Sequence, residues 1–526
     1  MTKTPTTLLL ILDGFGLPGP KDKDTVVNAK NMPHFFSWLK KFPHTSLEAS
    51  GAAVGLFKGQ AGNSEAGHLN LGAGRIVKQD ALYISDAIKD GTFFKNNAFH
   101  DAIHHLKKYR TAAHVIGLLS NHNSAHSSPE HLYALLEFLH REGVKKVYLH
   151  LFTDGRDSGQ HDAMHHLKKL QQHFCGKEKI ATIMGRLYGM DRNKIWKRTR
   201  AAYEAVVLGE ALHHAASPEE ALAQGYNRGE TDEFIFPTVI TDTKREPVAT
   251  IKDNDAMFFF NLRSDRARQL TKALVQQKFE KLNPGAFHRR GLPKHTRFVA
   301  MTDFGPDLPG VLTAFPSRDI QNSLVQVLCP LRQLYIAESE KFAHITYFFN
   351  GGYAQPFCDE AWVKVASDTV MSYDTKPKMQ TRKIADQVIR ALSSKQYDFI
   401  AVNLANADMV GHTGNPKAGV EAVRELDDEL ARIIAALLKT GGQGVLTADH
   451  GNIEELTNLK TGEIDTEHST NPVPCIVFGS PAQLREWKLV NRSLRARGAK
   501  LCQVAPTVIK MMRLPKPKEM TALPLF

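Results

Sequence analysis

The amino-acid sequence predicts an α/β fold in which parallel sheets are covered by helices. Three observations lead to this prediction: short apolar runs of strand length recur, segments with helical periodicity lie between them, and polar residues follow the runs directly. Strands that alternate with helices are typical of parallel sheets. At about 100–200 residues per domain, a chain of 526 residues has room for two or three domains.

The predicted strands are buried apolar segments. The first, residues 6–12, stops at Asp13-Gly14, a pair that favours a turn. Similar runs occupy residues 113–119, 146–152, 398–404 and 443–448. Helical patterns over residues 382–392 and 419–438 complete the alternation.

Polar motifs follow each of the five predicted strands. They are Asp13, Ser120 to His122, Thr153 to Asp157, Asn406 to Asp408, and Asp449 to Asn452. In open α/β sheets, ligands bind at the carboxyl ends of the strands. The functional groups are therefore expected at these edges.

Carboxylates and imidazoles are paired in these motifs. Asp408 and His412 are four residues apart, which places both on one face of a helical turn. Asp449-His450 is a second pair, and Asp13 and His468 add one more carboxylate and one more imidazole. An isolated Asp–His pair is more often a cap or a loop hydrogen bond, but several clusters at strand ends favour metal binding. Mixed carboxylates and imidazoles suit Mn²⁺, Zn²⁺ or Fe²⁺ better than Ca²⁺, and three Asp with three His can hold two such ions.

Ser64 lies in a glycine-flanked segment, residues 62–68. Taken alone, this segment predicts a turn that leads into a helix. Beside two metal ions the serine gains a chemical role, because a divalent metal lowers the pKa of an oxygen that it coordinates. Such a serine can act as a phosphoryl nucleophile.

Eleven short segments between residue 12 and residue 474 form an ordered set of motifs. They are LDGFG (12–16), GNSEAGH (62–68), DGRD (154–157), GR (185–186), MDR (190–192), NLRSDR (261–266), AESEK (337–341), FFNGG (348–352), ANADMVGH (405–412), TADHGN (447–452) and HSTNPVP (468–474). In these segments and in their order, the chain resembles the cofactor-independent phosphoglycerate mutases of the alkaline phosphatase superfamily.

The resemblance implies a two-domain fold. An alkaline-phosphatase-like α/β sandwich domain would comprise residues 1–77 and 314–526, and an α/β transferase domain, residues 78–313, would be inserted into it. The implied activity is the interconversion of 2-phospho-D-glycerate and 3-phospho-D-glycerate through a phosphoserine. The implied cofactors are two divalent metal ions, usually Mn²⁺, with no 2,3-bisphosphoglycerate. The family also implies a monomer.

The resemblance also assigns the site residues. One metal would be held by Asp408, His412 and His468, and the other by Asp13, Ser64, Asp449 and His450, with Ser64 as the nucleophile. Asp157 would act as acid and base on the glycerate hydroxyls, and Lys341 would offset charge at phosphorus. The substrate would be bound by His126, Arg156, Asp157, Arg186, Arg192, Arg263, Arg266 and Lys341, since arginine forks match phosphate and carboxylate groups.

One loop departs from the family's pattern. Residues 121–128 are one residue longer than the corresponding DGGVHSH segment and lack its glycines. His126 aligns best with the family's substrate-binding histidine, and His122 is the alternative.

Composition limits the other classes of protein. A net charge of +12 invites a nucleic-acid-binding interpretation, but the Lys and Arg residues are dispersed along the sequence and no nucleic-acid recognition motif is present. The densest basic stretch, residues 487–500, is interpreted as a solvated helix face. No apolar run reaches the ~18 residues of a membrane span, and the N-terminus does not resemble a secretory signal. Five scattered cysteines, an odd number without a CxxC pair, favour a reduced, cytoplasmic protein. Within the superfamily, a metal-dependent phosphatase or a phosphopentomutase remains an alternative.

Overall fold

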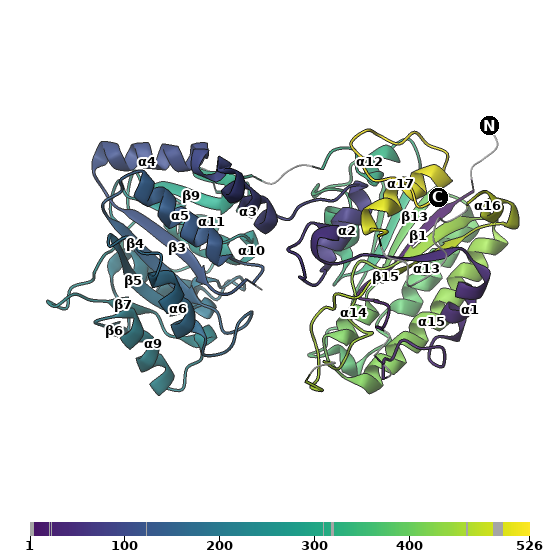
Figure 1. The fold of residues 1–526 in the computed structure, drawn as a ribbon, viewed down its shortest axis with the longest axis horizontal. Coiled ribbons are helices and arrows are strands. Elements are labelled where there is room, and N and C mark those ends of the chain that lie inside the picture. Colours follow the sequence, from purple (N-terminus) through teal and green to yellow (C-terminus); the bar gives the residue numbers. More distant parts are fainter. Residues whose placement is uncertain are drawn as a thin grey trace. The chain divides into compact units, whose positions relative to one another are not determined.

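The computed structural model describes residues 5–19, 22, 24–122, 124–308, 310–316, 320–458, 461–487 and 498–526. The chain divides into two compact units (Figure 1). Unit 1 comprises residues 1–79 and 319–526, and unit 2 comprises residues 80–318. Most of the basic stretch at 487–500 lies outside the described residues.

Unit 1 is built on a seven-stranded sheet with the order β12-β11-β13-β1-β14-β15-β2. Its strands are β1 (Thr7–Leu12), β2 (His44–Leu47), β11 (Gln333–Glu338), β12 (Ala361–Val365), β13 (Phe399–Leu404), β14 (Gln443–Thr447) and β15 (Val473–Phe478). The five strands from β12 to β14 are parallel, whereas β15 and β2 run antiparallel to their neighbours. The register pairs Leu12 with Leu404 and Ile11 with Thr447. The residues that follow β1, β13 and β14 therefore emerge side by side.

The helices of unit 1 contribute to one apolar core together with this sheet. They are α1 (Pro33–Lys41), α2 (Ser64–Ala73), α12 (Leu324–Val327), α13 (Thr381–Ser394), α14 (Asn406–Gly411), α15 (Pro416–Lys439), α16 (Pro481–Glu486) and α17 (Val504–Met511). All six residues of β1 are buried, as a central strand covered on both faces requires. The carboxylate of Asp427, from α15, accepts hydrogen bonds from the backbone N–H groups of His34 (2.9 Å) and Phe35 (2.8 Å). Asp427 thereby caps α1 from a distant part of the chain.

Unit 2 has an eight-stranded sheet with the order β10-β9-β8-β3-β4-β5-β7-β6. Its strands are β3 (Ala113–Leu119), β4 (Val147–Thr153), β5 (Glu178–Gly185), β6 (His213–Ala215), β7 (Thr238–Ile240), β8 (Ala256–Phe259), β9 (Arg297–Thr302) and β10 (Val311–Phe315). All neighbours are parallel except β5 and β7. Leu119 pairs with Thr153, and Thr153 pairs with Gly185, so the segments after β3, β4 and β5 meet at one edge.

Helices cover both faces of the unit 2 sheet. They are α3 (Asp80–Asp90), α4 (Asn97–Tyr109), α5 (Pro129–Arg141), α6 (Ala163–Gln171), α7 (Arg186–Gly189), α8 (Trp196–Tyr203), α9 (Pro218–Asn227), α10 (Ser264–Val275) and α11 (Phe279–Leu282). One apolar core joins the sheet to α3, α4, α5, α6 and α9, and a second joins it to α8, α10 and α11. Unit 2 is thus a three-layer α/β/α arrangement.

The predicted fold class is confirmed. Each of the five strands predicted from apolar runs is present within one residue at either end, and both predicted helices are present. The sheets are not purely parallel as predicted, because β15, β2 and β7 pair antiparallel. The units divide after residues 79 and 318, whereas the family resemblance placed the boundaries after 77 and 313.

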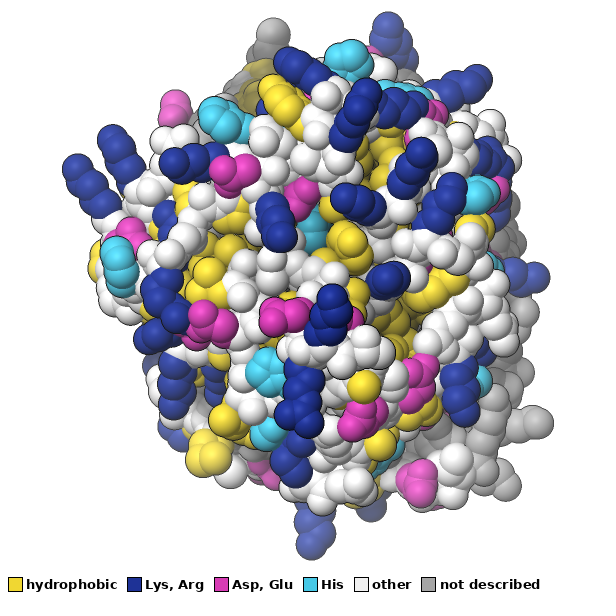
Figure 2. Space-filling model, turned by 90° about the vertical axis from the view of Figure 1, so that its left-hand side faces the viewer, with side chains coloured by type: hydrophobic (Ala, Val, Ile, Leu, Met, Phe, Trp, Pro, Cys, Tyr) yellow, Lys and Arg dark blue, Asp and Glu magenta, His cyan; other side chains and the backbone are white. Residues whose placement is uncertain are grey.

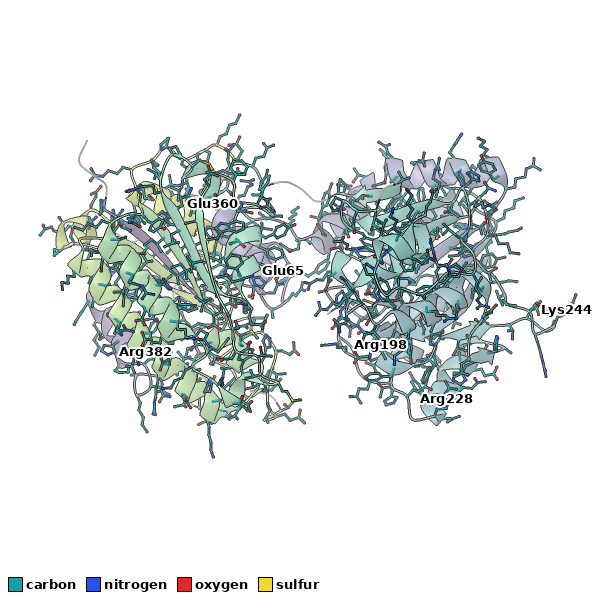
Figure 3. The ribbon with its side chains drawn as sticks, turned by 180° about the vertical axis from the view of Figure 1, so that it is seen from behind. Glu65, Arg198, Arg228, Lys244, Glu360 and Arg382 are labelled. Carbon is teal, nitrogen blue, oxygen red and sulfur yellow. A yellow bond between two sulfur atoms is a disulfide. The ribbon has the colours of Figure 1, made fainter. Side chains whose placement is uncertain are left out.

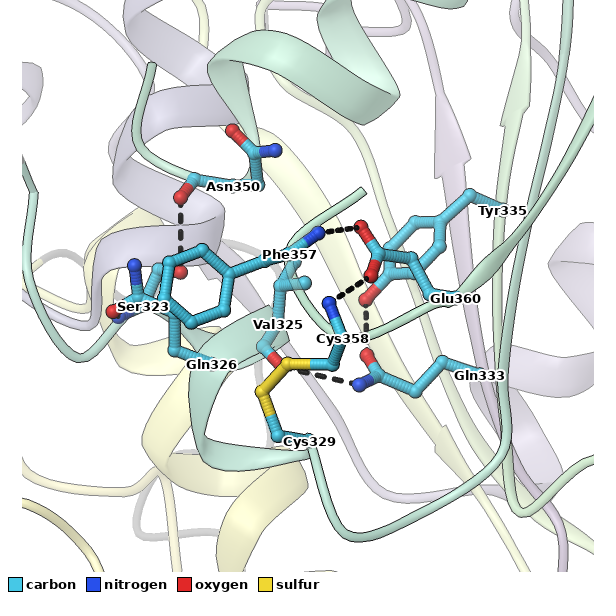
Figure 4. Close-up of a disulfide and its surroundings, with 10 residues drawn as sticks. All are labelled: Ser323, Val325, Gln326, Cys329, Gln333, Tyr335, Asn350, Phe357, Cys358 and Glu360. Carbon is cyan, nitrogen blue, oxygen red and sulfur yellow. Dashed lines mark hydrogen bonds between the residues drawn. A yellow bond between two sulfur atoms is a disulfide. The ribbon is translucent and has the colours of Figure 1, made fainter. Parts of the chain in front are cut away.

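Cys329 and Cys358 form a disulfide in unit 1 (Figure 4). Their Cα atoms are 5.2 Å apart, within the range that a disulfide spans. The Glu360 side chain, labelled in Figures 3 and 4, fixes the loop before β12 by accepting from the backbone N–H groups of Phe357 (3.0 Å) and Cys358 (2.8 Å). The expectation that every cysteine is reduced is therefore wrong for this pair. A separation of 29 residues without a CxxC spacing gives no signal in the sequence.

Basic side chains on the face of unit 2 seen in Figure 2 are interspersed with acidic and apolar ones. Several are paired at the surface, such as Arg268 with Asp307 and Arg297 with Asp101 (3.1 Å). Among the described residues, no helix is both long enough and apolar enough to cross a membrane.

Candidate active site

Ser64 is the first residue of helix α2 and is buried. The Asn63 side chain caps the helix by accepting a hydrogen bond from the backbone N–H of Ala66 (2.9 Å). A Cβ atom at Gly67 would lie 2.5 Å from the carbonyl oxygen of Asp449, so only glycine lets α2 pack this closely on that loop. The Ser64 hydroxyl is thereby held at a helix N-terminus, where the backbone favours negative charge. Glu65, labelled in Figure 3, follows it in the first turn.

Three side chains from separate segments converge on Ser64 Oγ. Lys341 Nζ donates to it (2.8 Å), His450 Nε2 lies 2.9 Å away, and Ser64 Oγ lies 3.2 Å from Asp13 Oδ1. Lys341 Nζ also contacts Asp13 Oδ1 (2.6 Å) and Asp408 Oδ2 (2.5 Å). The edge formed by the ends of β1, β11, β13 and β14 thus surrounds one serine oxygen with charged groups.

The charges in this cluster shift one another's pKa values. Burial alone would lower the pKa of Lys341, but Asp13 and Asp408 outweigh it and raise that pKa above the usual range. Burial would raise the pKa of Asp408, but the Lys341 ammonium reverses the effect and holds it well below the usual range. Both groups are therefore charged at neutral pH.

The imidazoles of His412 and His468 are arranged as metal ligands. Their Nδ1 atoms each lie 2.8 Å from a backbone carbonyl oxygen, that of Thr466 and that of Gly62 respectively. Because a carbonyl can only accept, each Nδ1 carries a proton, and in the neutral ring each Nε2 then presents a lone pair. The two Nε2 atoms are 3.1 Å apart, and Asp408 Oδ1 lies 3.5 Å from one and 3.3 Å from the other. Two lone pairs and a carboxylate oxygen that face one another fit a bound cation.

Two groups of ligand atoms meet the distance requirement for a metal site. One contains Asp408, His450 and His468, and the other contains Asp13, Asp449 and His450; within each, the ligand atoms lie within 4.8 Å of one another. His412 adjoins the first group through the contacts just described. All seven residues expected as metal ligands thus lie in one cluster of unit 1, and the donor set fits two divalent ions.

Two buried side chains behind the cluster had no predicted role. Asn403 Nδ2, from within β13, donates to Asp13 Oδ2 (2.6 Å) and lies 2.9 Å from His68 Nε2. His68 Nδ1 lies 3.1 Å from Asp449 Oδ2. These contacts orient the two carboxylates. In the sequence, an amide side chain within an otherwise apolar predicted strand is the feature that could have identified Asn403 as a functional residue.

The last residue of β11, Glu338, makes unit 1 sensitive to pH. Burial raises its pKa to about 7 from an ordinary value of 4.5. Folding therefore favours the protonated form, and the associated stability is full below pH 4.5 and is lost as the pH rises through 7. We expect Glu338→Gln to stabilise the protein more at pH 8 than at pH 5, by about 2–3 kcal/mol in the free energy of unfolding. Urea denaturation at the two pH values measures this, and an equal change at both would contradict it.

Arg186, at the start of α7, anchors the corresponding edge of unit 2. It is 2% exposed, and its Nη1 contacts Asp154 Oδ1 and Asp157 Oδ2, the latter at 3.0 Å. The hydroxyl of Ser120 donates to the other oxygen of Asp154. The ends of β3, β4 and β5 are joined by these bonds.

Further arginines lie around this anchor. Arg192 Nη1 contacts Asp265 Oδ2 (2.5 Å), and Arg263 Nε lies 3.9 Å from the other oxygen of the same carboxylate. Burial and then the neighbouring charges of Arg186, Arg192 and Arg156 lower the pKa of Arg266. Arg156 is exposed, 3.7 Å from Glu233. The five expected arginines thus gather at one edge of unit 2 and present more positive charge than the nearby carboxylates offset.

His126 lies with these arginines, and His122 does not. Burial, Arg186 and Arg263 lower the pKa of His126 to about 3, so the ring is neutral. Its Nδ1 atom is buried without a hydrogen-bond partner among the described residues. His122 is exposed and contacts Glu130 of α5 (3.0 Å).

The longer loop supplies Ser124, which the sequence did not single out. Its hydroxyl donates to Asp157 Oδ2 (2.8 Å) and accepts from the backbone N–H of His126 (3.2 Å). Burial would raise the pKa of Asp157, but Arg186 and the Ser124 hydroxyl lower it below the usual value. Ser124 therefore connects two of the residues expected to bind substrate.

Comparison with known proteins agrees with the division of the chain into two units. Residues 84–306 match the model of the BPG-independent PGAM N-terminus, and residues 315–491 match that of the type I phosphodiesterase / nucleotide pyrophosphatase family. The 2,3-bisphosphoglycerate-independent phosphoglycerate mutase 1 of Methanosarcina acetivorans is 45% identical over 525 residues, covering 99% of this chain and 98% of the relative. The chain belongs to the family of 2,3-bisphosphoglycerate-independent phosphoglycerate mutases.

A second relative and a solved structure support the assignment. The enzyme of Moorella thermoacetica is 44% identical over 526 residues, covering 99% of this chain and 98% of its own. A crystal structure of Leishmania mexicana phosphoglycerate mutase at low cobalt concentration superposes with a TM-score of 0.76 at 30% identity, covering 99% of this chain and 97% of that one. The resemblance stated from the sequence is confirmed.

Proposed function

We propose that this protein is an isomerase that interconverts 2-phospho-D-glycerate and 3-phospho-D-glycerate through a phosphoserine at Ser64, without 2,3-bisphosphoglycerate. The observation that carries the proposal is the convergence of Lys341, His450 and Asp13 on Ser64 Oγ. This convergence joins a nucleophile to groups that stabilise charge. The proposal extends to this chain the activity for which its relatives are named.

The proposed metal ligands are the cluster of unit 1. Asp408, His412 and His468 would hold one divalent ion, and Asp13, Ser64, Asp449 and His450 the other. When bound, two such ions supply Lewis-acid stabilisation of negative charge on the phosphoryl oxygens. Mn²⁺ is the proposed metal because the family resemblance implies it; the ligand set alone also suits Zn²⁺ and Fe²⁺.

The chain's own residues would perform the transfer in two steps. Ser64 Oγ gives its proton to Asp13 Oδ1, to which it donates a hydrogen bond, and forms a bond to phosphorus while the bond between phosphorus and one glycerate oxygen breaks. The Asp157 carboxylate takes the proton of the other glycerate hydroxyl and passes it to the departing oxygen. The deprotonated oxygen then attacks the phosphoserine and releases Ser64 Oγ, which takes its proton back from Asp13. Lys341, in contact with Ser64 Oγ, offsets the negative charge that develops there.

Unit 2 is proposed to hold the substrate's anionic groups. Arg156, Arg186, Arg192, Arg263 and Arg266 offer paired N–H donors to carboxylate and phosphate. The unpartnered Nδ1 of His126 adds a neutral hydrogen-bonding group beside them. The glycerate carboxylate stays bound while the hydroxyls exchange places, which is the positioning that an intramolecular transfer requires.

Location and partners complete the proposal. A glycolytic role favours a cytoplasmic monomer that binds neither nucleic acid nor membrane. Interspersed surface charge supports the first exclusion (Figure 2).

An enolase-coupled assay tests the function. Purified protein receives 3-phosphoglycerate and Mn²⁺ but no 2,3-bisphosphoglycerate. We expect turnover that EDTA abolishes and added Mn²⁺ restores. Release of inorganic phosphate without mutase turnover would indicate a phosphatase, and the absence of both from metal-loaded protein would refute the proposal.

The hydrogen bond from Ser124 to Asp157 gives a pH prediction. Since this bond lowers the pKa of Asp157, Ser124→Ala should raise it. We expect the acidic limb of kcat/KM, measured at saturating metal, to move to higher pH by roughly half to one unit, the equivalent of about 1 kcal/mol. Ser128→Ala, which removes a hydroxyl whose hydrogen bond within the described part of the chain is to Glu130 (2.8 Å), is the matched control and should leave the limb in place.

A further inference from the structure

Glu454 is a buried carboxylate, and both of its oxygens accept hydrogen bonds from neutral donors. Oε2 accepts from the backbone N–H groups of Gly16 (2.9 Å) and Asn452 (2.9 Å). Oε1 accepts from the Ser469 hydroxyl and from Asn471 Nδ2 (3.1 Å). Its side chain is fully buried, and no Lys, Arg or His of the described chain forms an ion pair with it.

The donors belong to three loops, and each loop carries proposed metal ligands. Gly16 lies three residues after Asp13, Asn452 lies two residues after His450, and Ser469 follows His468 directly. The same loops are joined by backbone bonds from Ile453 to Gly14 (3.1 Å) and from Ser469 to Gly451 (3.0 Å). Glu454 is therefore the side chain that all three ligand loops share.

Packing leaves the carboxylate no alternative position. A Cβ atom at Gly16 would lie 2.3 Å from the Glu454 carboxyl carbon, and one at Gly451 would lie 2.4 Å from its Oε1. Both glycines thus allow the loops to close on the carboxylate. A shift of Glu454 would move Asp13, His450 and His468 together.

The chemistry requires a carboxylate and not an amide. All four partners donate, and an ionised carboxylate is the only side chain of this shape that accepts at both ends. A buried anion without a paired cation is costly. Two divalent ions held by the adjoining ligands would offset its charge.

We propose that Glu454 is a positioning residue that sets the metal affinity of unit 1 by holding the Asp13, His450 and His468 loops in register. It touches neither substrate nor, through its own oxygens, the proposed ligand atoms. The inference rests on the proposed ligand set and is independent of which phosphorylated substrate is used.

The test is metal affinity measured without substrate. Apo protein is titrated with Mn²⁺ and followed by electron paramagnetic resonance of the free ion. In Glu454→Gln an NH₂ group faces two donors, and we expect the dissociation constant to rise about 10- to 100-fold. Glu455→Gln is the matched control, because the donor that the described residues offer to this neighbouring, half-buried carboxylate is Asn471 (3.0 Å); we expect a change below about twofold.

Two further measurements separate positioning from folding. The thermal midpoint of the apo protein should fall much less than the metal affinity, and excess Mn²⁺ should restore most of kcat. If Glu454→Gln does not fold, Ser469→Ala decides the matter by removing one donor, with an expected increase of several-fold in the dissociation constant. Unchanged affinity in a folded Glu454→Gln, or in Ser469→Ala when the first variant does not fold, would overturn the proposal. Since no substrate is present, this outcome is distinct from failure of the mutase assignment.

Discussion

Ser64→Ala is expected to abolish mutase turnover, with a fall in kcat of at least about 10⁴-fold, as for the removal of other catalytic nucleophiles. No other hydroxyl among the described residues is placed between Lys341, His450 and Asp13. Lys341 keeps its contacts with Asp13 and Asp408 in the variant, so its charge remains paired. The thermal midpoint should therefore stay within a few degrees of the parent's.

Acid-quenched protein provides a direct check of this result. Incubation with labelled 3-phosphoglycerate should mark the peptide that contains Ser64 in the parent and leave the variant unlabelled. Ser37→Ala is the control, because that hydroxyl bonds, among the described residues, to the His34 carbonyl within α1 (2.8 Å). Retention of more than about one per cent of turnover by Ser64→Ala would show that another group carries the phosphoryl.

Arg186→Ala is expected to remove both substrate binding and much of the stability of unit 2. The guanidinium is buried against Asp154 and Asp157, and its loss would leave two carboxylates without their cation. Breaking a buried pair of this kind costs about 3–5 kcal/mol. Calorimetry of the full chain should show the transition of unit 2 moving to lower temperature while that of unit 1 stays in place.

Arg192→Ala provides a comparison within the same group of arginines. Arg192 belongs to the same arginine group, but its side chain is 51% exposed. Loss of an exposed ion pair costs less than about 1 kcal/mol. We expect both variants to lose at least about 100-fold in kcat/KM, the value of one to two charged hydrogen bonds, but only Arg186→Ala to lose stability. Equal destabilisation by the two substitutions would contradict the role given to Arg186.

The sequence predicted the strands because their apolar runs are local. Residues 7–12 are buried on both faces and stop at Asp-Gly, and both properties are visible without neighbours. The positions of Asp13, Asp408 and Asp449 at strand ends could be predicted from the same local patterns. That these ends are adjacent depends on the pairing of β1 with β13 and β14, which local patterns do not specify.

The features that were missed depend on contacts between distant segments. Glu454 gathers donors from residues 16 to 471, and nothing in its own surroundings distinguishes it from Glu455 beside it. Ser124 gains its role from a carboxylate 33 positions away. The Cys329–Cys358 pair and the antiparallel strands β2 and β15 follow from the same long-range packing.

The place of β1 at the centre of its sheet has a consequence for biosynthesis. Residues 7–12 leave the ribosome long before their two neighbours in the sheet, residues 399–404 and 443–447. At about 5–20 residues per second, the nascent strand waits roughly 20–80 s for a partner. All of unit 2 is synthesised within that interval and can fold, while the apolar segment TLLLIL remains without its sheet. The nucleophile-bearing unit is thus completed last, after the chain that interrupts it.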